Sequence, residues 1–142
     1  MKVEEILRKK KEPRIITIRM NETVEVAIRL LRKENIGALI VKDVVRTEGN
    51  TVVGMFSERD VVRALADRGP AALKMRVADL MSRTIVSCSP QDELSRVLEL
   101  MERHHIRHLP VLDGIAPVGV VSIRDALSER TGTDPHSVGL VA

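Results

Sequence analysis

One pattern of residues that could bind a sugar and a phosphate occurs twice in this sequence. Residues 54–60 read Gly-Met-Phe-Ser-Glu-Arg-Asp, and residues 119–125 read Gly-Val-Val-Ser-Ile-Arg-Asp. In both copies a short apolar run leads into Ser-x-Arg-Asp, which is typical of a strand that feeds a helix. The start of a helix offers backbone N–H groups to an anion, and an arginine fork suits phosphate. The aspartate can accept hydrogen bonds from both hydroxyls of a ribose.

The candidate site residues are therefore the serine, arginine and aspartate of each copy. Ser-x-x-Asp also fits a capping box, in which the two side chains satisfy backbone N–H groups at a helix start. For a single copy the cap would be sufficient explanation, but the repetition favours two related nucleotide sites. The residues are Ser57, Arg59 and Asp60 in the first copy and Ser122, Arg124 and Asp125 in the second.

The segments around the two motifs repeat as well. Apolar residues at helical spacing predict helices over residues 21–34 and 92–104, capped by Asn21 or Thr23 and by Ser89 or Asp92. Turn residues at 48–50 and 113–114 predict hairpins, and each motif opens a further helix. The expected order in each half is β-α-β-β-α. Strands are predicted at 15–18, 37–41 and 51–56 in the first half and at 85–88, 109–112 and 118–121 in the second.

The repeat also predicts how the chain is divided. We expect a first repeat at residues 1–70, a second at 71–130 and a mobile C-terminal tail at 131–142. Short apolar helical turns over residues 3–7 and 77–81 are expected to lead into the two halves, and the lysines at 9–11 are interpreted as a solvated loop. Because half of this chain would be marginally stable alone, the halves are expected to share a core.

The composition argues against several classes of protein. The 142 residues carry a formal net charge of +3 and one aromatic side chain, Phe56. Proteins that bind single-stranded nucleic acid stack bases on aromatic rings, so this function is not expected. A nucleic-acid alternative would use residues 9–11, Arg29, Arg32 and Lys33, with a steep salt dependence. Apolar runs are too short to cross a membrane and no signal-peptide pattern is present, so we expect a cytoplasmic protein.

Neither a catalytic residue nor a metal ligand is predicted. Cys88 is the single cysteine, which excludes an intramolecular disulfide and a cysteine metal site. His104 and His105 are expected to end a helix, where positive charge suits the helix dipole. Because the next residues read as a strand, His108 does not share a helix face with them. The sequence contains no P-loop and no nucleophile elbow.

The tandem β-α-β-β-α order, with Gly-x-x-Ser-x-x-Asp near the end of each half, resembles a pair of CBS domains, also called a Bateman module. Residues 105–111, His-Ile-Arg-His-Leu-Pro-Val, also resemble that family's central strand, and the resemblance covers residues 3–129. It implies an α/β fold in which two repeats pack with pseudo-twofold symmetry around two clefts. It further implies a regulatory protein that binds AMP, ADP, ATP, NAD(H) or S-adenosylmethionine and is not an enzyme.

The resemblance also implies roles for particular residues. Asp60 and Asp125 would hold ribose hydroxyls, and the serine and arginine of each motif would face phosphates. We expect the two clefts to differ in affinity, or one of them to be empty, because one set of partners is small and the other is large and basic. Each aspartate would work with strands of the opposite half: Asp125 with Ile16, Gly37 and Ala38, and Asp60 with Ile85, Val86, Arg107 and His108.

Partners are implied in the same way. CBS pairs usually form homodimers through the helices around each motif, and the regulated protein would be a separate, unknown chain. The alternative is a dimerising interaction scaffold whose capping boxes bind no nucleotide. The apolar residues of these helices, which the sequence does not divide between core and dimer surface, are Val24, Ile28, Leu31, Val61, Leu65, Leu94, Leu98 and Met101.

Overall fold

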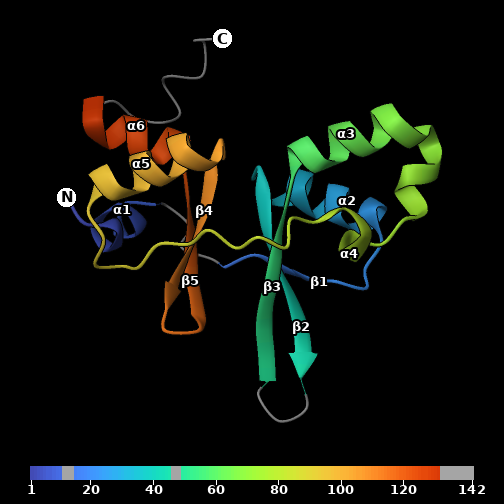
Figure 1. The fold of residues 1–142 in the computed structure, drawn as a ribbon, viewed down its shortest axis with the longest axis horizontal. Helices are drawn as coiled ribbons and strands as arrows, with labels where there is room; N and C mark the ends of the chain where they lie inside the picture. The colour runs from blue at the N-terminus through green and yellow to red at the C-terminus, as the bar shows by residue number, and fades with distance from the viewer. Residues whose placement is uncertain (11–14, 46–48, 132–142) are drawn as a thin grey trace. The chain divides into compact units, whose positions relative to one another are not determined.

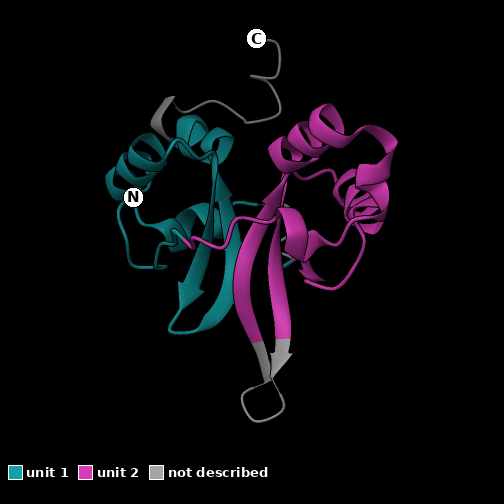
Figure 2. Ribbon diagram, turned by 45° about the vertical axis from the view of Figure 1, so that its right-hand side comes forward, with its two compact units in different colours: residues 1–15, 86–142 teal, residues 16–85 magenta. Residues whose placement is uncertain are grey.

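The computed structural model describes residues 1–10, 15–45 and 49–131, and the chain divides into two compact units. Unit 1 comprises residues 1–15 and 86–142, and unit 2 comprises residues 16–85 (Figure 2). Each unit combines helices with a small β-sheet, which confirms the predicted α/β class. The predicted tail at 131–142 lies almost wholly outside the described residues.

Unit 2 is built on a three-stranded sheet in the order β1-β2-β3. The central strand β2 pairs in parallel with β1 and antiparallel with β3 (Figure 1). Gly49 and Asn50, predicted to lie in a turn, instead belong to β3 and pair with the end of β2. The elements of unit 2 are β1 (Thr17–Arg19), α2 (Val24–Glu34), β2 (Ala38–Val45), β3 (Gly49–Ser57), α3 (Glu58–Arg68), the 3₁₀ helix η1 (Gly69–Lys74) and α4 (Val77–Leu80).

Unit 1 is built on an antiparallel pair of strands, β4 and β5. The turn between them contains Gly114, whose φ of 65° is the conformation that glycine adopts most readily. The elements of unit 1 are α1 (Val3–Arg8), α5 (Leu94–His104), β4 (His108–Asp113), β5 (Ala116–Ser122) and α6 (Ile123–Thr131).

The predicted strand at residues 85–88 is wrong, because only Cys88 pairs with β4. Cys88 donates to the carbonyl of Pro110 at 3.0 Å and accepts from the N–H of Leu112 at 2.8 Å. To extend this parallel pairing by one step, the backbone N–H of residue 110 would have to donate to the carbonyl of Val86. Proline has no N–H, so the ladder stops after a single bridge.

Unit 2 has an isoleucine at the corresponding place, and there the strand forms. Ile40 occupies the position of Pro110, and its N–H donates to the carbonyl of Ile16 at 3.4 Å. The parallel pairing then continues along β1 from Thr17 to Arg19. On the other side of the bridge, Met20 donates to the carbonyl of Lys42 at 3.1 Å, whereas Pro90 at the corresponding place in unit 1 has no N–H. The two prolines thus explain why the two sheets have different numbers of strands.

The helix boundaries follow the predicted ranges within three residues, but one cap differs. Thr23 caps α2 by accepting a hydrogen bond of 3.3 Å from the N–H of Val26. Glu93 takes the equivalent position before α5, whereas predicted Asp92 accepts from the N–H of Ser89 at 2.8 Å and closes a turn before the helix. His105 ends α5 in the left-handed conformation, with a φ of 53°.

The two short helices pack in the unit opposite to the repeat that they precede in sequence. Helix α1 contributes Val3 to the buried cluster of unit 1, and α4 contributes Val77 to that of unit 2. The N–H of Val3 donates to the carbonyl of Asp92 at 2.9 Å, and that of Val77 donates to Glu22 at 2.8 Å. The sequence predicted only that each turn leads into its half, and it did not indicate which core the turn enters. Each repeat supplies a helix to the core of the other.

Two buried residues limit the chemistry of these cores. Phe56, the one aromatic residue of the chain, is fully buried in unit 2 and offers no stacking surface. Cys88 is buried in unit 1, and this burial, with a smaller effect from the charge of Asp92, raises the pKa of its thiol to about 12. The thiol therefore stays protonated at neutral pH and is a poor nucleophile.

Candidate functional site

The first motif lies where β3 ends and α3 begins. Ser57 pairs with Ala38 at the start of β2, and the N–H of Glu58 donates to the carbonyl of Gly37 at 3.0 Å. The hairpin therefore holds the predicted small residues of β2 beside the first turn of α3. The amino end of an eleven-residue helix, a serine and an aspartate meet at this point of unit 2.

Asp60 is tied to this helix start by hydrogen bonds. Its Oδ2 accepts from the backbone N–H of Ser57 at 2.8 Å and from Ser57 Oγ at 3.3 Å. Burial raises the pKa of the Asp60 carboxyl, although these hydrogen bonds and the charges of Arg63 and Arg59 lower it. A carboxylate that has lost part of its hydration favours additional hydrogen-bond donors, such as ligand hydroxyls.

The second motif has the same geometry in unit 1. Asp125 Oδ2 accepts from the N–H of Ser122 at 2.9 Å, and Ser122 Oγ accepts from the N–H of Asp125 at 3.1 Å. Ser122 pairs with His108, and the N–H of Ile123 donates to the carbonyl of Arg107 at 2.8 Å. The capping box expected from the sequence is thus present, and each motif lies beside the start of the preceding strand in its own unit.

The remaining predicted residues are divided between the two units. Ile16 is the first residue of unit 2, and its carbonyl accepts a hydrogen bond from the N–H of Ile40 in β2. Arg59 and Arg124 are exposed in the first turns of α3 and α6. Val86 belongs to unit 1, whereas Ile85 is the last residue of unit 2. The predicted pairing of each aspartate with strands of the opposite half stays a prediction.

This duplicated arrangement corresponds to a known family. Residues 3–67 and 77–132 match the family model of the CBS domain. The chain belongs to the CBS domain family. It is a CBS domain pair, a regulatory module, as the resemblance of its motifs indicated.

Known CBS proteins match this chain in sequence and in structure. A CBS-domain containing protein from Agrobacterium tumefaciens superimposes with a TM-score of 0.82 at 30% identity, covering 91% of this chain and 92% of that one. A CBS domain pair solved in complex with 5′-methylthioadenosine and S-adenosyl-L-methionine has a TM-score of 0.75 at 27% identity, covering 93% of this chain and 96% of that one. The mitochondrial CBS domain-containing protein CBSX3 of Arabidopsis thaliana is 30% identical over 75% of this chain, which spans only 52% of that relative.

The structure adds one residue to the site that sequence reasoning missed. Lys10, which follows α1, places its Nζ 2.8 Å from Asp125 Oδ2 within unit 1 of the CBS pair. Its neighbour Lys9 places its Nζ 3.0 Å from Glu129 Oε2 on α6. The interpretation of these lysines as a solvated loop is therefore wrong for Lys10, whereas Lys9 is exposed to solvent despite its ion pair, and Lys11 lies outside the described residues. The run of three lysines is visible in the sequence. Their acidic partners could not be predicted from it, because Lys9 and Lys10 reach Glu129 and Asp125 only when α1 packs in unit 1.

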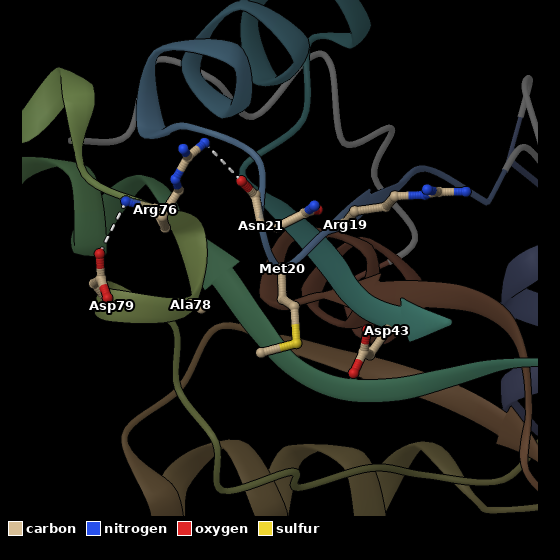
Figure 3. A pocket seen from close by; sticks show the side chains of 7 residues that line it. All are labelled: Arg19, Met20, Asn21, Asp43, Arg76, Ala78 and Asp79. Carbon is tan, nitrogen blue, oxygen red and sulfur yellow. Dashed lines mark hydrogen bonds between the residues drawn. The ribbon is translucent and has the colours of Figure 1, made fainter. Parts of the chain in front are cut away.

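A pocket of about 510 Å³ lies in unit 2 away from the motif (Figure 3). It sits near Asp43, which pairs with Thr51 in the β2–β3 hairpin, whereas the motif lies where Ala38 pairs with Ser57. Arg76 donates to the carbonyl of Asn21 at 2.9 Å at its edge. None of the predicted site residues lines it. The residues that do are Arg19, Met20, Asn21, Asp43, Arg76, Ala78 and Asp79.

Within residues 1–10, 15–45 and 49–131, no three His, Cys, Asp or Glu side chains are grouped so that they could hold a metal ion. In the same described part of the CBS pair, every helix is too short or too polar to span a bilayer.

Proposed function

We propose that this CBS pair binds an adenine nucleotide, namely AMP, ADP, ATP or NAD(H), and signals its presence to a separate protein. The observation that carries the proposal is the duplicated helix start, with Asp60 and Asp125 in the same local geometry. The related CBS pair that was solved with two adenosine compounds supports adenosine as the common part of the ligand. The chain would have no reaction of its own.

The capping bonds leave the aspartates able to bind a ligand. In both motifs the N–H of the serine donates to Oδ2, and a carboxylate has two oxygens that together accept about four hydrogen bonds. The other oxygen can therefore accept from the ribose hydroxyls while the helix stays capped. The helix dipole and the arginine that precedes each aspartate favour the phosphate end of the same ligand.

Regulation would work through linkage between ligand binding and conformation. A nucleotide that binds one conformation of the CBS pair more tightly raises the population of that conformation, and a partner that recognises it then binds more tightly. Such a coupling is typically about 1–3 kcal/mol, or five- to 150-fold in affinity.

The second candidate is a scaffold that binds no nucleotide. It is favoured by the capping bonds themselves, because Ser57 with Asp60 and Ser122 with Asp125 already satisfy backbone groups at both helix starts. In that case the motifs would serve stability alone. The two candidates differ in whether removal of the aspartate charge affects the binding of any ligand.

A thermal-shift panel separates the candidates. We expect at least one of AMP, ADP, ATP, NAD⁺ and NADH to raise the melting temperature, because a ligand at 100 times its Kd adds about 2.7 kcal/mol to the free energy of unfolding. Adenosine, S-adenosylmethionine and GMP complete the panel. The combined variant Asp60→Asn and Asp125→Asn should abolish the shift, since asparagine keeps a capping oxygen but lacks the charge.

Two aspartates outside the motifs provide matched controls. Asp79 accepts from the N–H of Arg76 at 3.0 Å, and Asp92 accepts from the N–H of Ser89 at 2.8 Å, so both cap a turn as the motif aspartates do. Asp79→Asn and Asp92→Asn should leave the nucleotide shift unchanged. A flat panel with protein stripped of bound nucleotide, or an equal loss in the controls, would favour the scaffold.

We also propose that the CBS pair forms a homodimer through α3. Val62 and Leu65 on this helix are 65% and 40% exposed, whereas Val24, Leu31 and Met101 are buried in the cores. Val62 and Leu65 are therefore exposed apolar residues that can contact a second copy. The other predicted contacts, on α2 and α5, are mostly used inside the units.

Sedimentation equilibrium tests the dimer. The unmodified protein should have the mass of a dimer at micromolar concentration, and the double variant Val62→Glu, Leu65→Glu should be a monomer. Arg68→Glu, at an exposed position in the last turn of α3, makes the same change in net charge and should stay dimeric. An unmodified protein that is monomeric throughout would contradict the proposal.

A further inference from the structure

An ion pair distinguishes the second aspartate of this CBS pair from the first. Lys10 Nζ lies 2.8 Å from Asp125 Oδ2 and donates a hydrogen bond of 2.5 Å to the carbonyl of Val120. The two side chains are only 31% and 16% exposed, so the pair is shielded from much of the solvent. Separating a shielded pair costs more than separating a surface pair, because both charges lose a partner where water cannot fully replace it.

Unit 2 has no lysine at the corresponding position. When Val3 of α1 is aligned with Val77 of α4, Lys10 corresponds to Thr84, whose side chain carries no charge. A ribose that binds Asp60 therefore has no ammonium group from this position to displace. A ribose that bonds to Oδ1 of Asp125 shares a carboxylate that Lys10 already contacts through Oδ2.

We propose that Lys10 makes the Asp125 site selective for ribonucleotides that carry a phosphate over neutral nucleosides. The inference rests on the proposed nucleotide function. When ribose hydroxyls donate to the carboxylate, they weaken its attraction for the ammonium group, and a phosphate on the same ligand supplies a second anion. Adenosine or 5′-methylthioadenosine weakens the pairing of Lys10 and offers no anion in return. S-adenosylmethionine would bring a second cation to the same place.

The flexibility of lysine suits this exchange of partners. Its ammonium group is a point charge on four methylene groups, and three N–H bonds can point to different acceptors without a fixed plane. The N–H of Lys10 bonds to the carbonyl of Leu7 at 3.2 Å, so the backbone at this position is held to the end of α1. Only the side chain needs to move.

Titration calorimetry with AMP and adenosine tests the inference. The protein carries Asp60→Asn, so that only the Asp125 site is measured. We expect Lys10→Met to lower the affinity for AMP about tenfold and to raise the affinity for adenosine about tenfold, since one charge-assisted hydrogen bond is lost or gained. The preference for AMP over adenosine should then fall about 100-fold. Lys10→Arg keeps the charge and should retain most of the preference.

Lys9 provides the matched control. It neighbours Lys10 and also forms an ion pair with α6, but its partner is Glu129, which is outside the motif. Lys9→Met removes the same charge and should leave the ratio of the AMP and adenosine affinities unchanged. Should Lys10→Met fail to fold, Lys10→Gln is compared with Lys10→Arg for the same ratio.

The possible results separate this inference from the proposed function. If the Asp60→Asn protein binds AMP and Lys10→Met leaves the ratio unchanged, Lys10 does not set selectivity although the nucleotide function stands. Binding of AMP to the unmodified protein but not to Asp60→Asn would also overturn the inference, because the Asp125 site would then be unused. If the unmodified protein binds no nucleotide at all, the proposed function fails first.

Discussion

Replacing Val3 with aspartate should destabilise unit 1, although Val3 lies in the first sequence repeat. Val3 is fully buried and belongs to the same cluster as Val97 and Leu109. The substitution removes about 1.5–3 kcal/mol of apolar burial and adds the cost of a desolvated carboxylate, about 4 kcal/mol or more in total. Hydrogen exchange followed by mass spectrometry should show faster exchange in α5, β4 and β5.

Val77 provides the reciprocal test. It occupies the matching place in α4 and is fully buried with Val24 and Phe56 in unit 2. Val77→Asp should therefore accelerate exchange in α2, β2 and β3. Ile115→Asp, at a position 86% exposed in the turn between β4 and β5, should change little. If Val3→Asp accelerated exchange in α2 and β2 instead, the assignment of α1 to unit 1 and of α4 to unit 2 would be wrong. If Val3→Asp does not fold, Val3→Ala can be used in its place, since it should lower the free energy of unfolding by only about 2 kcal/mol.

The sequence predicted the helices well because their signal is local. The apolar stripes of α2 and α5 determine which face of each helix is buried. Thr23 begins α2 and His105 ends α5 through interactions with residues close to them in the sequence. The short helices show where this information stops. Spacing such as that of Val3 and Ile6 indicates that a face is buried, but not which core it enters.

The strand expected at residues 85–88 also depends on residues elsewhere in the chain. The β-branched residues there are as suitable for a strand as those of β1. What differs lies in the partner strand, where Pro110 cannot donate the hydrogen bond that Ile40 donates in unit 2. A prediction for one segment therefore depended on the register of another segment, about 20 residues away.

The motif residues were predictable because the same short pattern occurs twice, and the structure gives both copies the same capping geometry. Lys10 was not predictable in this way. It lies far from Asp125 in the sequence, and it reaches the aspartate only because α1 packs in unit 1. Asymmetry between two copies of a motif can thus come from a segment outside both.

Replacing the glycine that begins each motif with alanine should lower the free energy of unfolding by different amounts in the two motifs. A Cβ at Gly54 would contact the backbone carbonyl oxygen of Ser82, and would lie 3.1 Å from Met81 Sδ. Met55 and Ser82 exchange backbone hydrogen bonds of 3.0 and 2.9 Å at this point. Gly54→Ala must therefore push two backbone segments apart, which we expect to cost about 3 kcal/mol through overpacking and the lost hydrogen bonds.

Gly119 is the control because its neighbour is a side chain. A Cβ at Gly119 would lie 2.9 Å from Leu7 Cδ2, the end of a side chain that can change its rotamer. Gly119→Ala should therefore cost about 1 kcal/mol or less. Urea unfolding followed by far-ultraviolet circular dichroism measures both, since the chain has no tryptophan or tyrosine. If the two substitutions cost the same, the contact of β3 with the segment after α4 is not as rigid as its hydrogen bonds indicate. A larger cost at Gly54 would mean that this glycine is required for chain packing, whether or not a ligand ever approaches it.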